Sequence, residues 1–260
     1  MGGSNVSKFF PDMYDSPETG QFVAGISYGI IPFLAMPFTL TLLTIGSDDA
    51  AIYVGIEYFY QAVSFLAMLW IYRTYLRDSW LNVSIQPKQV LSVSLGAAAF
   101  IAAIYIESFF AAYRGIYPQA NTVFFGILPM TGIELTMLPG DLVLFGGLPA
   151  VLVLVVLGPV ITSCLFYASA FAPVCAAGKP VWAYISVAAL LAVPRLVTSV
   201  TVWGGWKEVE LYLAQLPIHM LACWTYQKTD TVWAPIFTHA MANAFCCAML
   251  YLLQLTGIIA

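Results

Sequence analysis

Residues 142–177 read LVLFGGLPAVLVLVVLGPVITSCLFYASAFAPVCAA and contain no Asp, Glu, Lys or Arg. A helix needs about 20 mainly apolar residues to cross the hydrocarbon core of a bilayer. The stretch is longer than one crossing requires, so we expect it to tilt, to kink at Gly158-Pro159 or to split.

The composition of the whole chain agrees with a membrane location. Of its 260 residues, 61% are hydrophobic and 8% are charged, and the mean hydropathy is +0.87. Soluble domains carry about 25% charged residues, so a water-soluble globular protein is excluded. Several charge-free stretches exceed the length of a membrane helix, which favours helices over a β-barrel. We therefore expect an all-α, polytopic transmembrane helical bundle.

The hydrophobic pattern predicts seven membrane spans, or eight if a broken segment at 115–140 also crosses. A polar N-terminal segment, 1–21, precedes a single transmembrane domain, 22–260. The seven predicted spans cover residues 22–45, 52–71, 90–112, 142–177, 180–203, 209–226 and 232–255.

The basic residues predict how the bundle is oriented. Arg73, Arg77 and Lys88 stand against Asp78 in what we expect to be a loop, 73–88. Because positive loops stay in the cytoplasm, we place this loop and the N-terminus there.

Charge and cysteine usage exclude several kinds of partner. The net charge is −4 and no basic run occurs, so nucleic acid is not an expected partner. The five cysteines lie in apolar segments without CxxC spacing, which predicts neither a zinc knuckle nor a disulfide framework. The expected partners are the lipid bilayer and another membrane protein.

Charged side chains inside membrane spans are candidate functional groups because burying them is costly. Glu57, Glu107 and Arg195 lie in predicted spans. The two glutamates could reach the interface, and Arg195 could form an ion pair with one of them or bind a ligand.

The only two histidines, His219 and His239, lie on consecutive predicted spans. Two imidazoles on adjacent helices could bind a metal or a b-type haem. Asn243 follows His239 by four residues, so both side chains share one helix face. That polar pair is either a clamp between helices or part of a catalytic or ligand site.

Residues 226–244 read YQKTDTVWAPIFTHAMANA. This segment resembles the last motif of the CPBP family of intramembrane proteins (CAAX protease and bacteriocin-processing, Abi), which includes Rce1-like prenyl-protein proteases. The resemblance implies a CPBP-like core at about 142–257. It also implies that His239 and Asn243 are the remnant of a catalytic motif.

The same resemblance indicates that other catalytic residues are missing. The family's first motif, EExxxR, should fall at 158–167, where Thr162 and Ser163 replace the paired glutamates and Tyr167 replaces the arginine. A second motif should supply a histidine near 188–196, and none is present there.

Three functions are therefore weighed. The first is a catalytically degenerate CPBP-like protein that acts as a scaffold, assembly factor or accessory subunit of a membrane complex, with no cofactor or metal. The second is an active zinc-dependent endopeptidase of the CAAX-prenyl-protease type, which a cluster of Glu107 or Glu134 with His219 around His239 would support. The third is a haem- or small-molecule-binding membrane protein.

Overall fold

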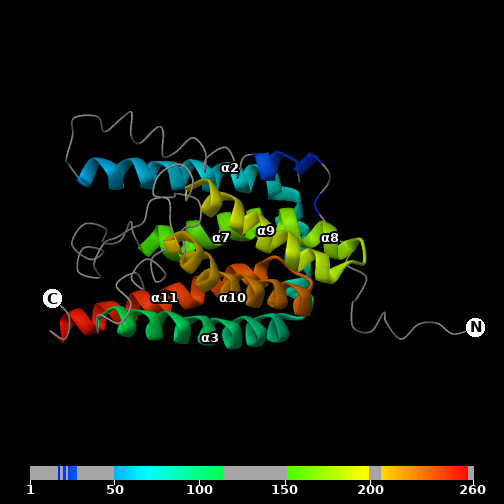
Figure 1. The fold of residues 1–260 in the computed structure, drawn as a ribbon. Coiled ribbons are helices and arrows are strands. Elements are labelled where there is room, and N and C mark those ends of the chain that lie inside the picture. Colours follow the sequence, from blue (N-terminus) through cyan, green and yellow to red (C-terminus); the bar gives the residue numbers. More distant parts are fainter. Residues whose placement is uncertain are drawn as a thin grey trace, which may run out of the picture.

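The computed structural model describes residues 17, 20–21, 23–27, 50–113, 151–198 and 206–256. Within these ranges every regular element is a helix, as the sequence predicted (Figure 1). The elements are α2 (Ala50–Ile85), α3 (Pro87–Tyr113), the π-helix η3 (Val153–Leu157), α7 (Gly158–Thr162), the π-helix η4 (Ser163–Phe171), α8 (Ala172–Ala176), α9 (Pro180–Thr198), α10 (Trp206–Thr229) and α11 (Trp233–Leu255).

Two of the described helical stretches are long and apolar enough to cross a membrane: Pro87–Ile104 and Val153–Ala176. The first overlaps the predicted third span, 90–112, and the second lies in the predicted fourth, 142–177. The predicted broken segment, 115–140, lies outside the described residues, as does most of the first predicted span, 22–45.

The predicted loop at 73–88 is wrong, because helix α2 continues through it to Ile85. Nothing between Arg73 and Ile85 is a glycine or proline, and charged residues are compatible with a helix. Only Gln86 separates α2 from α3, which begins at Pro87. Proline fits the first turn of a helix and disrupts an interior, so the break falls there.

The four elements from η3 to α8 follow one another as a single central helix, which lies between α2 and α11 (Figure 1). Its residues from Gly158 to Ala172 are all buried. We expected a tilt, a kink at Gly158-Pro159 or a split in this stretch; within residues 151–176 it does not split, and its winding changes at Gly158. The Gly158 N–H donates five residues back, to the Val153 carbonyl, before α winding resumes in α7.

The turn between α10 and α11 is held by side chains from the α2–α3 junction. The last carbonyls of a helix lack partners within it. Here the carbonyls of Lys228, Thr229 and Asp230 accept hydrogen bonds from Gln89 Nε2 at 3.0 Å, Gln86 Nε2 at 3.2 Å and Asn82 Nδ2 at 2.6 Å, respectively. These hydrogen bonds therefore connect the turn to a segment that lies 139–148 residues earlier in the sequence.

Helix α2 also fixes the residues that open α11. The Ser79 and Thr231 hydroxyls lie 2.9 Å apart, and Ser79 Oγ accepts the Val232 N–H at 3.0 Å. Trp233 donates its indole N–H to the Leu76 carbonyl at 2.8 Å. Its ring packs edge-on against Trp80, with centroids 4.9 Å apart. These contacts set the level in the bundle at which α11 begins.

We expect Ser79→Ala to lower the free energy of unfolding by about 1–2 kcal/mol, because it removes a buried hydroxyl that ties α2 to the α10–α11 turn. Thermal or denaturant unfolding in detergent measures the change. Ser84→Ala is the matched control, since Ser84 is exposed and bonds only within α2, to the Trp80 carbonyl. Equal stability of the two variants would contradict this account of the turn.

Candidate functional site

Tyr167, His219 and His239 meet through their polar ends in the bundle interior. The Tyr167 hydroxyl lies 2.9 Å from His219 Nδ1 and 2.8 Å from His239 Nε2. The three residues come from η4, α10 and α11 and are 0%, 5% and 2% exposed. The structure thus brings together the two histidines that the sequence placed on consecutive spans, and it adds a tyrosine between them.

A tyrosine hydroxyl has one proton to donate and can also accept hydrogen bonds. When it donates to one imidazole nitrogen, the nitrogen of the other ring can donate an N–H to it. Both nitrogens that face Tyr167 are then satisfied with all three groups neutral. Such a neutral network suits a site that is closed to bulk water.

Aromatic packing holds the two imidazoles in place. The Phe166 ring lies 4.7 Å from the His219 ring, between centroids. The Tyr167 and His239 rings are nearly parallel, with 7° between their planes. A haem iron bound through His219 Nδ1 and His239 Nε2 would have to displace the Tyr167 hydroxyl from both nitrogens.

Asn243 holds α11 to the central helix. Its Nδ2 donates to the Leu154 carbonyl at 2.7 Å. In the π winding of η3 that carbonyl would pair with the N–H five residues ahead, but this residue is Pro159, which has no N–H. The amide of Asn243 therefore satisfies an acceptor that the proline leaves unpaired.

The described residues do not fit a zinc site. Among them, no three His, Cys, Asp or Glu side chains lie close enough to bind one ion. A catalytic zinc needs about three protein ligands and an open position. Thr162 and Ser163, which the resemblance places at the paired glutamates, are 2% and 0% exposed and offer hydroxyl groups only.

The structure does not describe the side chains of the remaining charged candidates. The side chains of Glu57, Glu107 and Arg195 lie outside the described residues, although their backbones belong to α2, α3 and α9. Glu134 lies outside them entirely. The structure therefore tests neither the ion pair or ligand role considered for Arg195 nor the glutamate near His239 that would support a peptidase.

The sequence analysis missed the role of Tyr167, which it treated only as the residue that replaces the family's arginine. One available signal was its position in the charge-free stretch 142–177. A tyrosine buried there needs a partner for its hydroxyl, and two histidines were available on later spans.

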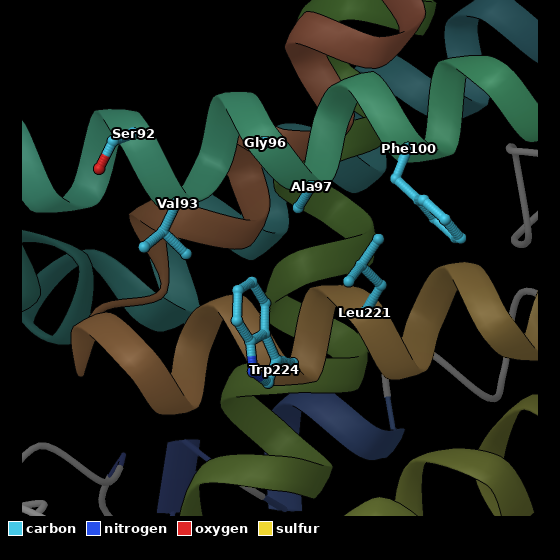
Figure 2. Close-up of a pocket in the computed structure, with 7 residues that line it drawn as sticks. All are labelled: Ser92, Val93, Gly96, Ala97, Phe100, Leu221 and Trp224. Atoms are coloured by element: carbon cyan, nitrogen blue, oxygen red, sulfur yellow. The ribbon is translucent and has the colours of Figure 1, made fainter.

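A separate groove of about 430 Å³ opens between α3 and α10. Figure 2 shows Val93, Ala97 and Phe100 of α3 facing Leu221 and Trp224 of α10. Its lining is mainly apolar, and it contains none of the residues of the Tyr167 network.

We expect Tyr167→Phe to lower the free energy of unfolding by about 1–3 kcal/mol, because it leaves two buried imidazole nitrogens without their partner. Unfolding in detergent measures this loss. The control is Tyr184→Phe, which removes one half-buried hydrogen bond, to Gln227 Oε1 at 2.8 Å. If Tyr167→Phe were no less stable than Tyr184→Phe, the network would not hold the bundle together.

Residues 143–245 match the family model described as Type II CAAX prenyl endopeptidase Rce1-like. Comparisons with curated proteins and with solved structures gave no match. The matched stretch contains the central helix, α9, α10 and the part of α11 that carries His239 and Asn243. It confirms the resemblance first seen in residues 226–244. The chain therefore carries an Rce1-like domain, from a membrane-embedded family, over residues 143–245.

Proposed function

We propose that the protein is a catalytically degenerate CPBP-like membrane protein that acts as a scaffold, assembly factor or accessory subunit of a membrane complex. The observation that carries this proposal is the Tyr167 hydroxyl, which bonds to both His219 and His239. In this proposal the imidazoles serve as interhelical contacts and do not bind a metal or activate water.

Hydrolysis of a peptide bond needs a group that removes a proton from water, and in this family's chemistry also a metal. Hydroxyl side chains stand at both positions where the family's paired glutamates are expected, Thr162 and Ser163. Asn243 uses its amide N–H to pair with a backbone carbonyl. The remnant of the motif thus supports packing of the bundle.

The proposal includes a polytopic topology of seven or eight spans, with the N-terminus and residues 73–88 on the cytoplasmic side. Helix α2 has 36 residues and so is about 54 Å long, more than the roughly 30 Å of hydrocarbon. At its basic end the Arg73 guanidinium lies 4.6 Å from the Trp70 ring, between its carbon Cζ and the ring centroid. Arg77 pairs with Asp78 at 3.1 Å in an exposed position. Tryptophan beside exposed charges is typical of a membrane interface.

The second candidate function is an active zinc-dependent endopeptidase of the CAAX-prenyl-protease type. One observation favours it: the rings of His219 and His239 lie 5.9 Å apart, between centroids. For this function Tyr167 would have to withdraw from the imidazoles, and a carboxylate such as Glu107 or Glu134 would have to join them.

A cleavage assay separates these two functions. We expect the purified protein, supplied with zinc, to leave a prenylated CAAX peptide uncleaved, because no complete ligand set accompanies the histidines among the residues that the structure describes. Cleavage by the wild-type protein that is lost in His239→Ala and retained in the Ser84→Ala control would establish the peptidase. The Ser84 side chain is exposed on α2.

Purification from the native membrane in mild detergent tests the binding role directly. We expect a membrane protein to copurify in stoichiometric amount and elemental analysis of the same sample to find no stoichiometric zinc. A protein that purifies alone and carries stoichiometric zinc would contradict the accessory role.

A further inference from the structure

Among the described residues, six buried side chains hold a polar atom without a hydrogen-bond partner. One is His239, through its Nδ1, and the other five form a set on three parts of the bundle. None of these residues is more than 2% exposed. We name the set the polar layer: Gln61 and Ser64 of α2, Thr162 of α7, Ser163 of η4 and Asn243 of α11 through its Oδ1.

Polar groups that are buried in native proteins almost always have a hydrogen-bond partner. The requirement is stricter inside a membrane, where the surrounding lipid offers none. One unpaired hydroxyl could be an isolated defect. Five unpaired side chains at one level of the bundle indicate a shared ligand.

The α2 members lie level with Thr162. Helix α2 and the central helix run in the same direction (Figure 1), and the Tyr72 hydroxyl bonds to Ser169 Oγ. Ser64 precedes Tyr72 by eight residues, and Thr162 precedes Ser169 by seven. Each therefore lies roughly 10–12 Å before the Tyr72–Ser169 contact along its own helix. Gln61 lies one turn further back, on the same buried face of α2.

The α11 member lies at the same level. Helix α11 runs opposite to the central helix (Figure 1) and is attached to it at two points. These are His239 with Tyr167 and Asn243 with the Leu154 carbonyl. Thr162 and Ser163 lie between the two attachment points on the central helix, so the His239–Asn243 face of α11 passes beside them.

We propose that the polar layer binds a neutral ligand that both donates and accepts hydrogen bonds, such as ordered water or the amide or hydroxyl group of a small solute. The layer has no charged side chain, so an ion would not be compensated there. Its hydroxyls and the Gln61 amide both donate and accept, while Asn243 Oδ1 accepts. A buried water is held by two to four such groups, roughly what this layer offers. The site is compatible with either of the functions discussed above.

A matched pair of serines tests the proposal. Ser163 and Ser169 both lie in η4 and are fully buried, but only Ser169 has protein partners, the Cys164 carbonyl at 2.8 Å and the Tyr72 hydroxyl. If a ligand occupies the layer, Ser163→Ala removes a hydrogen bond and lowers the melting temperature by about 2–4 °C, as Ser169→Ala does. If the layer is dry, Ser163→Ala removes an unpaired hydroxyl and leaves the melting temperature unchanged or raises it.

A second variant on another helix keeps the test independent of η4. Ser64→Ala should lower the melting temperature in the same way, and an unchanged or raised value for both Ser64→Ala and Ser163→Ala would overturn the proposal. Native mass spectrometry then distinguishes the two sources of the ligand. A bound organic mass that is lost in Ser64→Ala identifies a solute, and its absence, with both variants destabilised, identifies water.

Discussion

The attachment of the α10–α11 turn to the α2–α3 junction is the constraint on which the rest of the interior depends. Gln89 and Gln86 satisfy the last two carbonyls of α10, and Asn82 satisfies the next one, in the turn. Ser79 and the Leu76 carbonyl hold the residues at the start of α11. Helix α11 can then begin at one level only. Six residues after Trp233, that level brings His239 to the Tyr167 hydroxyl.

Proline chemistry supplies the second attachment. Pro159 leaves the Leu154 carbonyl without an N–H donor in the π winding of η3, and Asn243 provides one. His239 and Asn243 are four residues apart, so two contacts on one face fix the rotation of α11 as well as its level. His239 and Asn243 thus both form hydrogen bonds between α11 and the central helix.

These contacts hold the helices of the Rce1-like domain together through neutral side chains. Packing depends on hydrogen bonds that neutral side chains can supply, whereas hydrolysis depends on a base and a metal. Thr162 and Ser163 are buried in the central helix and carry no charge. Their hydroxyls need hydrogen-bond partners, which is the reason for the proposed ligand in the polar layer.

The sequence by itself determined the all-helical class, the positions of α3, α9, α10 and α11, and the Rce1-like motif, because hydropathy and four-residue spacing are local properties. It misjudged 73–88 because charge density does not decide whether a helix ends. Only the tertiary structure joined Tyr167 to His219 and His239, which lie 52 and 72 residues away. Which buried polar groups meet depends on the level and rotation of three packed helices, and no local pattern encodes that.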